Sequence, residues 1–219
     1  FQQLIRNSLI NDFEVFIADD GSKDETRYLV ARLKKECSFQ IYHYWQPDNG
    51  YQKAKINNKV FGDITPEKHA IIICVDHDVI VHYQFVEDHY NAHERIYFAP
   101  LLFMGRRVDL SPELTAKITP ENVLEFNHGL SSELVFSALK GQTQNVLRSV
   151  RLNTPRWLTH LLKRDRVFDL LGSNYSITTK VMHDVNGYNE DFKSYWGEDG
   201  DLFVRVRNSG VKIDGQIGY

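Results

Sequence analysis

The chain has 219 residues, of which 42% are hydrophobic and 25% are charged, and its formal net charge is −3. This composition is typical of a soluble globular protein with one substantial domain, and it argues against a general nucleic-acid binder, which would be strongly basic. The two cysteines, Cys37 and Cys74, do not suggest a disulfide framework, and no apolar run reaches the ~18 residues of a membrane span. We therefore expect a cytoplasmic protein.

Strand-like and helical segments alternate through the first hundred residues. The strand-like runs are Phe13–Asp19, Phe39–Trp45, His69–Asp76 and Arg95–Pro100. Helical patterns separate them at Asp24–Glu36, Gly50–Phe61 and Tyr83–Glu94. Alternation at this spacing predicts an α/β fold with a mostly parallel central sheet flanked by helices.

The pattern loosens between residues 101 and 168, where we expect a helical insertion with proline-marked helix starts. Order returns in residues 169–219, with an extended run "LLGSNYSITT", a helix around Lys180–Asn186 and a last helix after Gly197. The chain opens on Phe1 within a helix-like pattern and ends within a strand-like one, so we expect a fragment of a longer protein. One domain overall accounts for these parts.

Carboxylates follow two of the expected strands. Asp19 and Asp20 follow the first strand, and Asp76 and Asp78 follow the third. Ligands of such sheets bind beyond the carboxyl ends of the strands, so both pairs should face one crevice. Asp76 and Asp78 can project on one face, where two carboxylates ~4 Å apart repel each other by roughly 1–4 kcal/mol. A hard divalent cation removes this repulsion, so the pair predicts a Mg²⁺ or Mn²⁺ site.

Turn chemistry explains only part of the segment "IADDGSKDET". Ser22 or Asp24 can cap the following helix, but this leaves Asp19 and Asp20 without a structural task. An acid at this edge of a sheet can accept a hydrogen bond from a nucleobase N–H or a ribose hydroxyl. The segment is therefore a candidate nucleotide site.

Basic and amide residues gather at the start of the helix that follows "WQPDNGYQ". We interpret Lys59 as part of a solvated helix face. Lys53, Lys55 and Asn58 lie nearer the helix start, where positive charge is poorly suited to the helix dipole. If these side chains face the crevice beyond the strand ends, they are instead suited to binding a diphosphate.

Three acids open the last helix, in the segment "YWGEDGDLFVRVRNSG". Acids in a first turn are stabilised by free N–H groups and by the helix dipole, by roughly 0.3–1 kcal/mol each at the surface. This explanation suits one acid better than three. We assign Asp201 to helix capping and treat Glu198 and Asp199 as candidates for chemistry.

Five ordered segments together resemble the family 2 glycosyltransferases of the GT-A fold, particularly the bacterial enzymes of surface-polysaccharide and lipopolysaccharide assembly. They are "FEVFIADDGSKDET", "QPDNGYQKAKINNKV", "IIICVDHDVIVHYQFVEDH", "LLGSNYSITTKVMHDVNGYNEDF" and "YWGEDGDLFVRVRNSG". The resemblance implies an inverting hexosyl- or N-acetylhexosaminyltransferase that moves a sugar from a UDP-sugar to a glycan or lipid-linked glycan with Mn²⁺ or Mg²⁺. It also implies that residues 1–100 form the nucleotide-sugar-binding half and residues 169–219 the acceptor-binding, catalytic half, around a variable insertion at 101–168.

The resemblance implies a role for each candidate on the nucleotide side. Asp20 resembles the acid that binds the uracil of the UDP-sugar, with Asp19 beside it. Lys55 and Asn58 resemble the basic and amide residues near the nucleotide.

The resemblance also implies roles at the metal and at the acceptor. Asp78 resembles the direct metal ligand, and Asp76 the partner that orients ribose or metal-bound water. Asp199 resembles the catalytic base, while Glu198 and Trp196 resemble residues that hold the acceptor sugar.

Two further segments have alternative interpretations. The basic stretch 148–166 is either an amphipathic helix packed on its own domain or a peripheral contact with the anionic inner face of a bacterial plasma membrane. His89 and His93 have the spacing of zinc ligands, but no H-E-x-x-H motif accompanies them, so we interpret them as part of a solvated helix face.

Three classes of function remain open from the sequence. A metal-dependent glycosyltransferase accounts for most of the motifs. A glycoside hydrolase also uses paired carboxylates but needs neither a nucleotide nor two acids at a strand end. A non-catalytic sugar- or nucleotide-binding relative is the third class. We expect no nucleic-acid partner in any of them.

Overall fold

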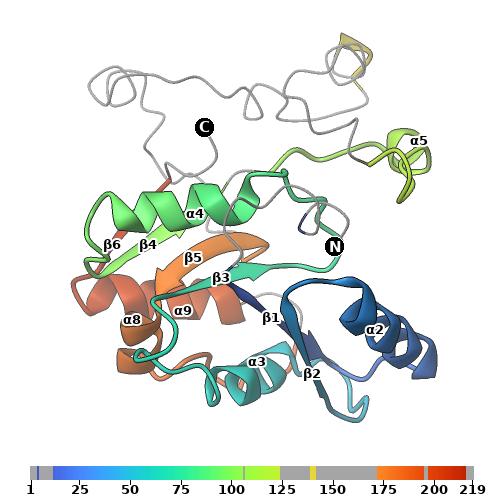
Figure 1. The fold of residues 1–219 in the computed structure, drawn as a ribbon. Coiled ribbons are helices and arrows are strands. Elements are labelled where there is room, and N and C mark those ends of the chain that lie inside the picture. Colours follow the sequence, from blue (N-terminus) through green and yellow to red (C-terminus); the bar gives the residue numbers. More distant parts are fainter. Residues whose placement is uncertain are drawn as a thin grey trace.

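The computed structural model describes residues 4, 12–105, 107–123, 139–141, 172–194 and 197–215. They form a mixed α/β fold in which two sheets that contain parallel strands are flanked by helices (Figure 1). Trp196 and the basic stretch 148–166 lie outside the described residues. Among the residues described, no helix combines the length and the apolar character that a membrane span requires.

The first sheet is a parallel pair. Strands β1 (Glu14–Asp19) and β2 (Gln40–Trp45) run side by side. Helix α2 (Asp24–Glu36) connects them, with acids in its first turn and lysines in its last turn, as the helix dipole favours. Helix α3 (Lys53–Phe61) contacts both strands. The side chains that α3 buries are Ala54, Ile56, Val60 and Phe61.

The second sheet has four strands in the order β3-β5-β4-β6. Their bounds are Ile71–Val75 for β3, Leu101–Met104 for β4, Asn174–Thr178 for β5 and Lys212–Asp214 for β6. Strands β4 and β6 are parallel, whereas β5 runs antiparallel to both β3 and β4. A strand from late in the chain is thus inserted between two strands from the first half.

Helices cover both faces of the second sheet. Side chains alternate along β5, so successive residues of this strand contact helices on opposite faces. Tyr175 and Ile177 face a core that also contains side chains of α8 (Thr179–Asp184) and α9 (Glu198–Asn208). Ser176 faces α4 (Phe85–Glu94) on the other side. Figure 1 shows α4 on one side of this sheet and α8 and α9 on the other. A short helix, α5 (Pro112–Thr115), follows β4.

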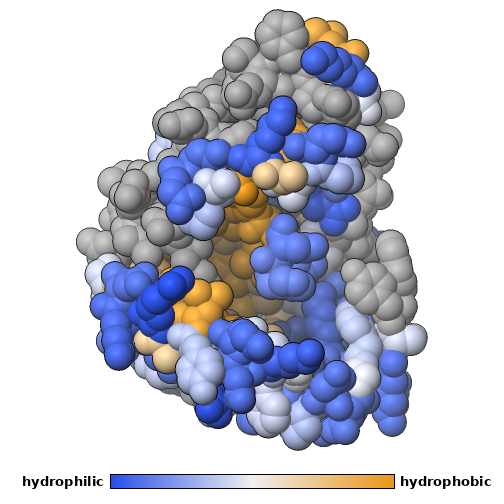
Figure 2. All heavy atoms as spheres, turned by 90° about the vertical axis from the view of Figure 1, so that its right-hand side faces the viewer, coloured by the Kyte–Doolittle hydropathy of each residue, from blue (hydrophilic) through white to orange (hydrophobic). Residues whose placement is uncertain are grey.

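The main core lies between the four-stranded sheet and helices α3, α8 and α9. Its fully buried side chains include those of Tyr175, Ile177, Leu102, Leu202 and Phe203. The rings of Tyr175 and Phe203 meet edge to face with their centroids 5.3 Å apart. Figure 2 shows one face of the molecule, on which hydrophilic atoms surround a recessed apolar area.

The fourth expected strand was placed too early. Residues 95–100 form a turn in which Tyr97 and Phe98 both have a φ of 53°, and the strand is Leu101–Met104. The residues that begin the expected insertion therefore form a strand of the second sheet. Two helices also begin later than expected, α3 at Lys53 and α4 at Phe85.

The interpretation of His89 and His93 as solvated residues was wrong. Both are fully buried between α4 and β5. His89 contacts the Ser176 hydroxyl through Nδ1 at 2.8 Å and the Asn174 amide oxygen through Nε2 at 3.0 Å, and His93 Nε2 contacts the same hydroxyl at 3.0 Å. Burial lowers the pKa of His89 to about 3 and that of His93 to about 4, so both are neutral.

Candidate active site

The end of β3 presents the two acids of the D-x-D pair differently. The backbone of Asp76 is fixed, because its N–H donates to Ser173 O at 3.2 Å and its carbonyl accepts from Val79 N–H at 3.2 Å. Its side chain is 38% exposed and faces Lys53. Asp78 is exposed and makes no hydrogen bond or ion pair with another described residue.

The start of α9 presents Glu198 and Asp199 as its first two residues. Gly197 precedes them with a φ of +127°, and a Cβ added there would lie 2.7 Å from the Phe192 ring, so glycine is required. Glu198 is only 3% exposed, and its Oε1 accepts a hydrogen bond from the Tyr51 hydroxyl. Its buried Oε2 has no hydrogen-bond partner within the described part of the chain.

The carboxylate of Asp199 is held at both oxygens. Oδ1 accepts from the Tyr188 hydroxyl at 3.0 Å, and Oδ2 accepts from Lys53 Nζ at 3.2 Å. The Tyr188 hydroxyl also contacts that of Tyr175 at 2.8 Å in the core. A Cβ added to Gly172 would lie 1.9 Å from Asp199 Oδ2, so the carboxylate packs directly against this glycine.

Lys53 joins the two halves of the site. It is the first residue of α3, and its Nζ lies 3.4 Å from Asp76 Oδ1, 3.7 Å from Glu198 Oε1 and 3.2 Å from Asp199 Oδ2. The acid that follows β3 and the two acids that open α9 therefore meet around one ammonium group. Residues 53, 76 and 198–199 come from three separate segments of the chain.

Burial and charge shift the pKa values of this cluster. Burial raises the pKa of Asp199 and outweighs the opposing effects of the Lys53 charge and the Tyr188 hydrogen bond. Burial disfavours the charged form of Lys53, but the negative charges of Asp199 and Asp76 more than offset it, and the pKa of Lys53 is raised. Asp199 is therefore a stronger proton acceptor than an exposed aspartate, and it faces a charged lysine.

Asp19 and Asp20 both have structural tasks, contrary to our expectation. Asp19 is buried and accepts hydrogen bonds from the backbone and hydroxyl of Ser22 and from His43. Burial opposes its ionisation, but these hydrogen bonds prevail and lower the pKa of Asp19. Asp20 accepts from Gln46 Nε2 at 2.6 Å and from the Gln52 N–H at 2.7 Å, which ties β1 to the loop before α3.

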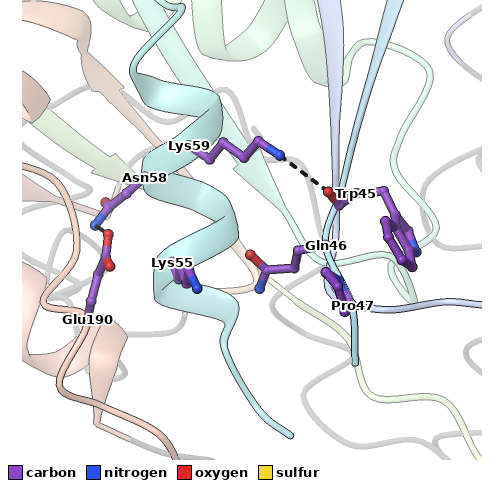
Figure 3. Close-up of a pocket in the computed structure, with 7 residues that line it drawn as sticks. All are labelled: Trp45, Gln46, Pro47, Lys55, Asn58, Lys59 and Glu190. Atoms are coloured by element: carbon purple, nitrogen blue, oxygen red, sulfur yellow. Dashed lines mark hydrogen bonds between the residues drawn. The ribbon is translucent and has the colours of Figure 1, made fainter. Parts of the chain in front are cut away.

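Lys55 and Asn58 do not contact the acids around Lys53 within the described part of the chain. Lys55 is exposed and lines a pocket of about 580 Å³. Figure 3 shows the other lining residues, which are Trp45, Gln46, Pro47, Asn58, Lys59 and Glu190. The Asn58 side chain donates to Tyr188 O at 2.8 Å and accepts from Tyr188 N–H at 2.8 Å, so it anchors the loop that carries Tyr188.

Asp201 does not cap α9. Its carboxylate accepts from Arg205 Nε at 2.7 Å, one turn later in the same helix, and its N–H donates to Gly197 O. The first turn of α9 thus contains one acid paired with an arginine of the same helix and two acids that face the Lys53 ammonium. The structural task of Asp201 therefore differs from the expected helix capping.

Sequence reasoning missed several residues that shape this site. It grouped Lys53 with Lys55, although residues two apart on a helix point about 200° apart, which would have separated them. It did not identify Tyr51, Tyr188 or Gly172, which hold Glu198 and Asp199. No local pattern marks these three residues, because each meets its partner only through the fold, at separations from 11 residues for Tyr188 to 147 residues for Tyr51.

The described residues contain no group of three or more His, Cys, Asp or Glu side chains that could hold a metal ion. Mg²⁺ is commonly bound through one or two carboxylates together with substrate phosphates and water. Asp76, which faces Lys53, and the exposed Asp78 present carboxylate oxygens, which are ligands of the kind that such a cation takes.

Comparison with known protein families gives two matches. Residues 2–114 match the family model described as Glycosyl transferase family 2, and residues 158–216 match the model described as N-terminal domain of galactosyltransferase. No curated protein matches the chain. The first match covers more than half of the chain, and the mixed α/β fold is consistent with the GT-A fold of that family. The chain therefore belongs to glycosyltransferase family 2.

Proposed function

We propose that this glycosyltransferase moves a hexosyl or N-acetylhexosaminyl group, with inversion, from a UDP-sugar to a glycan or a lipid-linked glycan. Family membership already implies a nucleotide-sugar donor and an acceptor. One observation carries the proposal: Asp199 of α9 and Asp76 of β3 contact the same Lys53 ammonium, at 3.2 and 3.4 Å. An acid able to act as a base thus lies beside an acid at the nucleotide edge of the sheet.

On the acceptor side, Asp199 acts as the general base. The acceptor hydroxyl oxygen forms a bond to the anomeric carbon while the bond from that carbon to the donor phosphate oxygen breaks, and UDP leaves with the electron pair. The hydroxyl proton passes to Asp199, whose raised pKa suits this role. The buried Oε2 of Glu198 has no hydrogen-bond partner among the described residues, which supports a role for Glu198 in accepting a hydrogen bond from a sugar hydroxyl. We assign the Trp196 ring, next to these acids in the sequence, to contact with the acceptor sugar.

On the donor side, Asp20 contacts the uracil, with Asp19 beside it, and Lys55 and Asn58 lie near the nucleotide. Each oxygen of Asp20 has a further lone pair beyond its contacts with Gln46 and Gln52. The pocket of about 580 Å³ lies next to Gln46 and includes Lys55 and Asn58, which favours a ligand on this side of α3.

Asp78 and Asp76 would hold Mn²⁺ or Mg²⁺ together with the donor diphosphate. A cation bound there supplies positive charge for the departing UDP. The exposure of Asp78, together with its lack of a partner among the described residues, favours this role. In this arrangement the Lys53 ammonium keeps its contact with the Asp76 carboxylate.

The biological role that we propose is cell-surface polysaccharide or lipopolysaccharide synthesis at the cytoplasmic face of a bacterial membrane. The basic stretch 148–166 would contact that membrane peripherally, where lipid-linked acceptors are found. The match to a domain of galactosyltransferase favours a hexose or N-acetylhexosamine donor.

The proposal is tested with a panel of UDP-sugars in the presence and absence of Mn²⁺. Thermal shift should show stabilisation that needs both nucleotide and metal, and proton NMR of the product should show inversion at the anomeric carbon. A retained configuration would contradict the role of Asp199. Cleavage of glycans without any nucleotide would indicate a glycoside hydrolase, and binding without turnover a non-catalytic relative.

A further inference from the structure

One ammonium group lies among three carboxylates in the centre of the site. Lys53 Nζ is within 3.7 Å of Asp76, Glu198 and Asp199, and the Lys53 side chain is only 24% exposed. Among the described residues, no other lysine or arginine forms an ion pair with these three acids. The cluster therefore carries excess negative charge that this one lysine partly neutralises.

We propose that Lys53 is a positioning residue of the transfer reaction, because it holds the base Asp199 and its neighbour Glu198 against Asp76 before substrates bind. This inference rests on the proposed function for the identity of the base. Lys53 acts as a permanent internal counter-ion that joins the acceptor side of the site to the donor side.

Coulomb's law gives the physical reason. Neighbouring carboxylates repel each other, and an ammonium that contacts all of them makes the net interaction attractive. Without Lys53, Glu198 and Asp199 would be repelled by Asp76, and the start of α9 would move away from the end of β3. Catalysis is sensitive to such movement, because a displacement of about 1 Å can cost about 100-fold in rate.

The two contacts of Asp199 also differ in what they fix. Tyr188 holds Oδ1 and comes from the same half of the chain as Asp199. Lys53 holds Oδ2 and comes from the other half, 146 residues away in sequence. Tyr188 therefore sets the orientation of the carboxylate within its own half, whereas Lys53 sets its distance from Asp76.

The first arm of the test needs neither donor nor acceptor. Thermal unfolding of the wild type, Lys53→Met and Lys180→Met is followed with and without MgCl₂. Lys180 is the matched control, because its ammonium also contacts a carboxylate, that of Asp184 at 2.6 Å, but at the surface. We expect Mg²⁺ to raise the melting temperature of Lys53→Met by about 3 °C more than that of the wild type, because the cation replaces the missing charge. Lys180→Met should respond like the wild type.

The second arm measures steady-state transfer. Lys53→Met should lower kcat by about tenfold or more while the donor KM stays within about twofold, and Lys53→Arg should restore part of kcat. Equal Mg²⁺ responses in Lys53→Met and the wild type, or an unchanged kcat, would overturn the proposal. Lys53→Gln is measured in parallel, and failure of both neutral variants to fold even in MgCl₂ would assign Lys53 to folding rather than positioning. If the wild type transfers no sugar, the proposed function fails, and the first arm still decides whether Lys53 is the counter-ion.

Discussion

Lys53 Nζ lies 3.2 Å from Asp199 Oδ2, although 146 residues separate the two in sequence. Lys53 belongs to the segment that matches the family 2 model, and Asp199 belongs to the segment that matches the galactosyltransferase domain model. The contact therefore joins two separately recognised parts of the chain into one site. It also gives the acid expected to act as the base a lysine partner that the sequence had grouped with Lys55 as a candidate for binding a diphosphate.

Asp199→Asn should abolish sugar transfer while leaving nucleotide binding intact. The amide cannot accept the hydroxyl proton, and general-base catalysis typically contributes about 10²–10⁴-fold to a rate. UDP release in the presence of acceptor measures transfer, and titration with UDP measures binding. Transfer near the wild-type rate would show that Asp199 is not the base.

Gly172→Ala should reduce transfer strongly, because the new methyl group would lie 1.9 Å from Asp199 Oδ2 and displace the carboxylate. The expected loss is about 100-fold in kcat or more, as for a displacement of about 1 Å. Gly62→Ala is the control, since a Cβ there would meet only backbone atoms at 3.5 Å or beyond. Equal activity of the two variants would contradict the close packing of Asp199 on Gly172.

Tyr188→Phe should lower both kcat and stability. It removes the hydroxyl that contacts Asp199 at 3.0 Å and Tyr175 at 2.8 Å, and the buried groups left unsatisfied should cost about 1–3 kcal/mol of the free energy of unfolding. Urea denaturation measures this loss. Tyr42→Phe is the matched control, because it removes only an exposed hydroxyl that contacts Glu14 at 3.3 Å. A Tyr188→Phe variant as stable as the control would argue against a role for the tyrosine pair.

Stability should fall as the pH decreases below about 6.5, because His89 and His93 stay neutral in the fold while the unfolded chain takes up protons. Their folded pKa values are lowered to about 3 and about 4. The contribution of these histidines to the free energy of unfolding is therefore fully present above their unfolded pKa. It is lost progressively as the pH falls from the unfolded pKa toward the folded pKa values. Each histidine contributes a slope of up to about 1.4 kcal/mol per pH unit.

Urea denaturation between about pH 7 and about pH 5 measures this slope. His89→Gln should reduce the slope by about half, because one of the two neutral histidines is then absent. A constant free energy of unfolding over this range, or an unchanged slope in the variant, would contradict burial of neutral histidines between α4 and β5.

Much of the fold could be predicted from the sequence, because hydrophobic periodicity and turn residues are local signals. The strands at Glu14–Asp19, Gln40–Trp45 and Ile71–Val75 and the helix Asp24–Glu36 lie within or at their expected bounds. The error at Arg95–Pro100 arose from two residues with positive φ, which a short apolar run does not reveal. The antiparallel insertion of β5 between β3 and β4 was also beyond sequence reasoning, since strand order depends on contacts between distant segments.

The candidate groups for a site could be named from the sequence alone: two acids after a strand and two acids at the start of a helix, in the order of a known family. How these groups are paired depends on the tertiary structure. It places Lys53, rather than Lys55, beside Asp76 and Asp199, and it gives Asp19 and Asp20 internal hydrogen bonds. Residue type and local periodicity set the direction in which a side chain points from its own helix or strand. The partner of that side chain belongs to another helix, strand or loop, often far away in the sequence. Only the packing of the whole core brings such partners together.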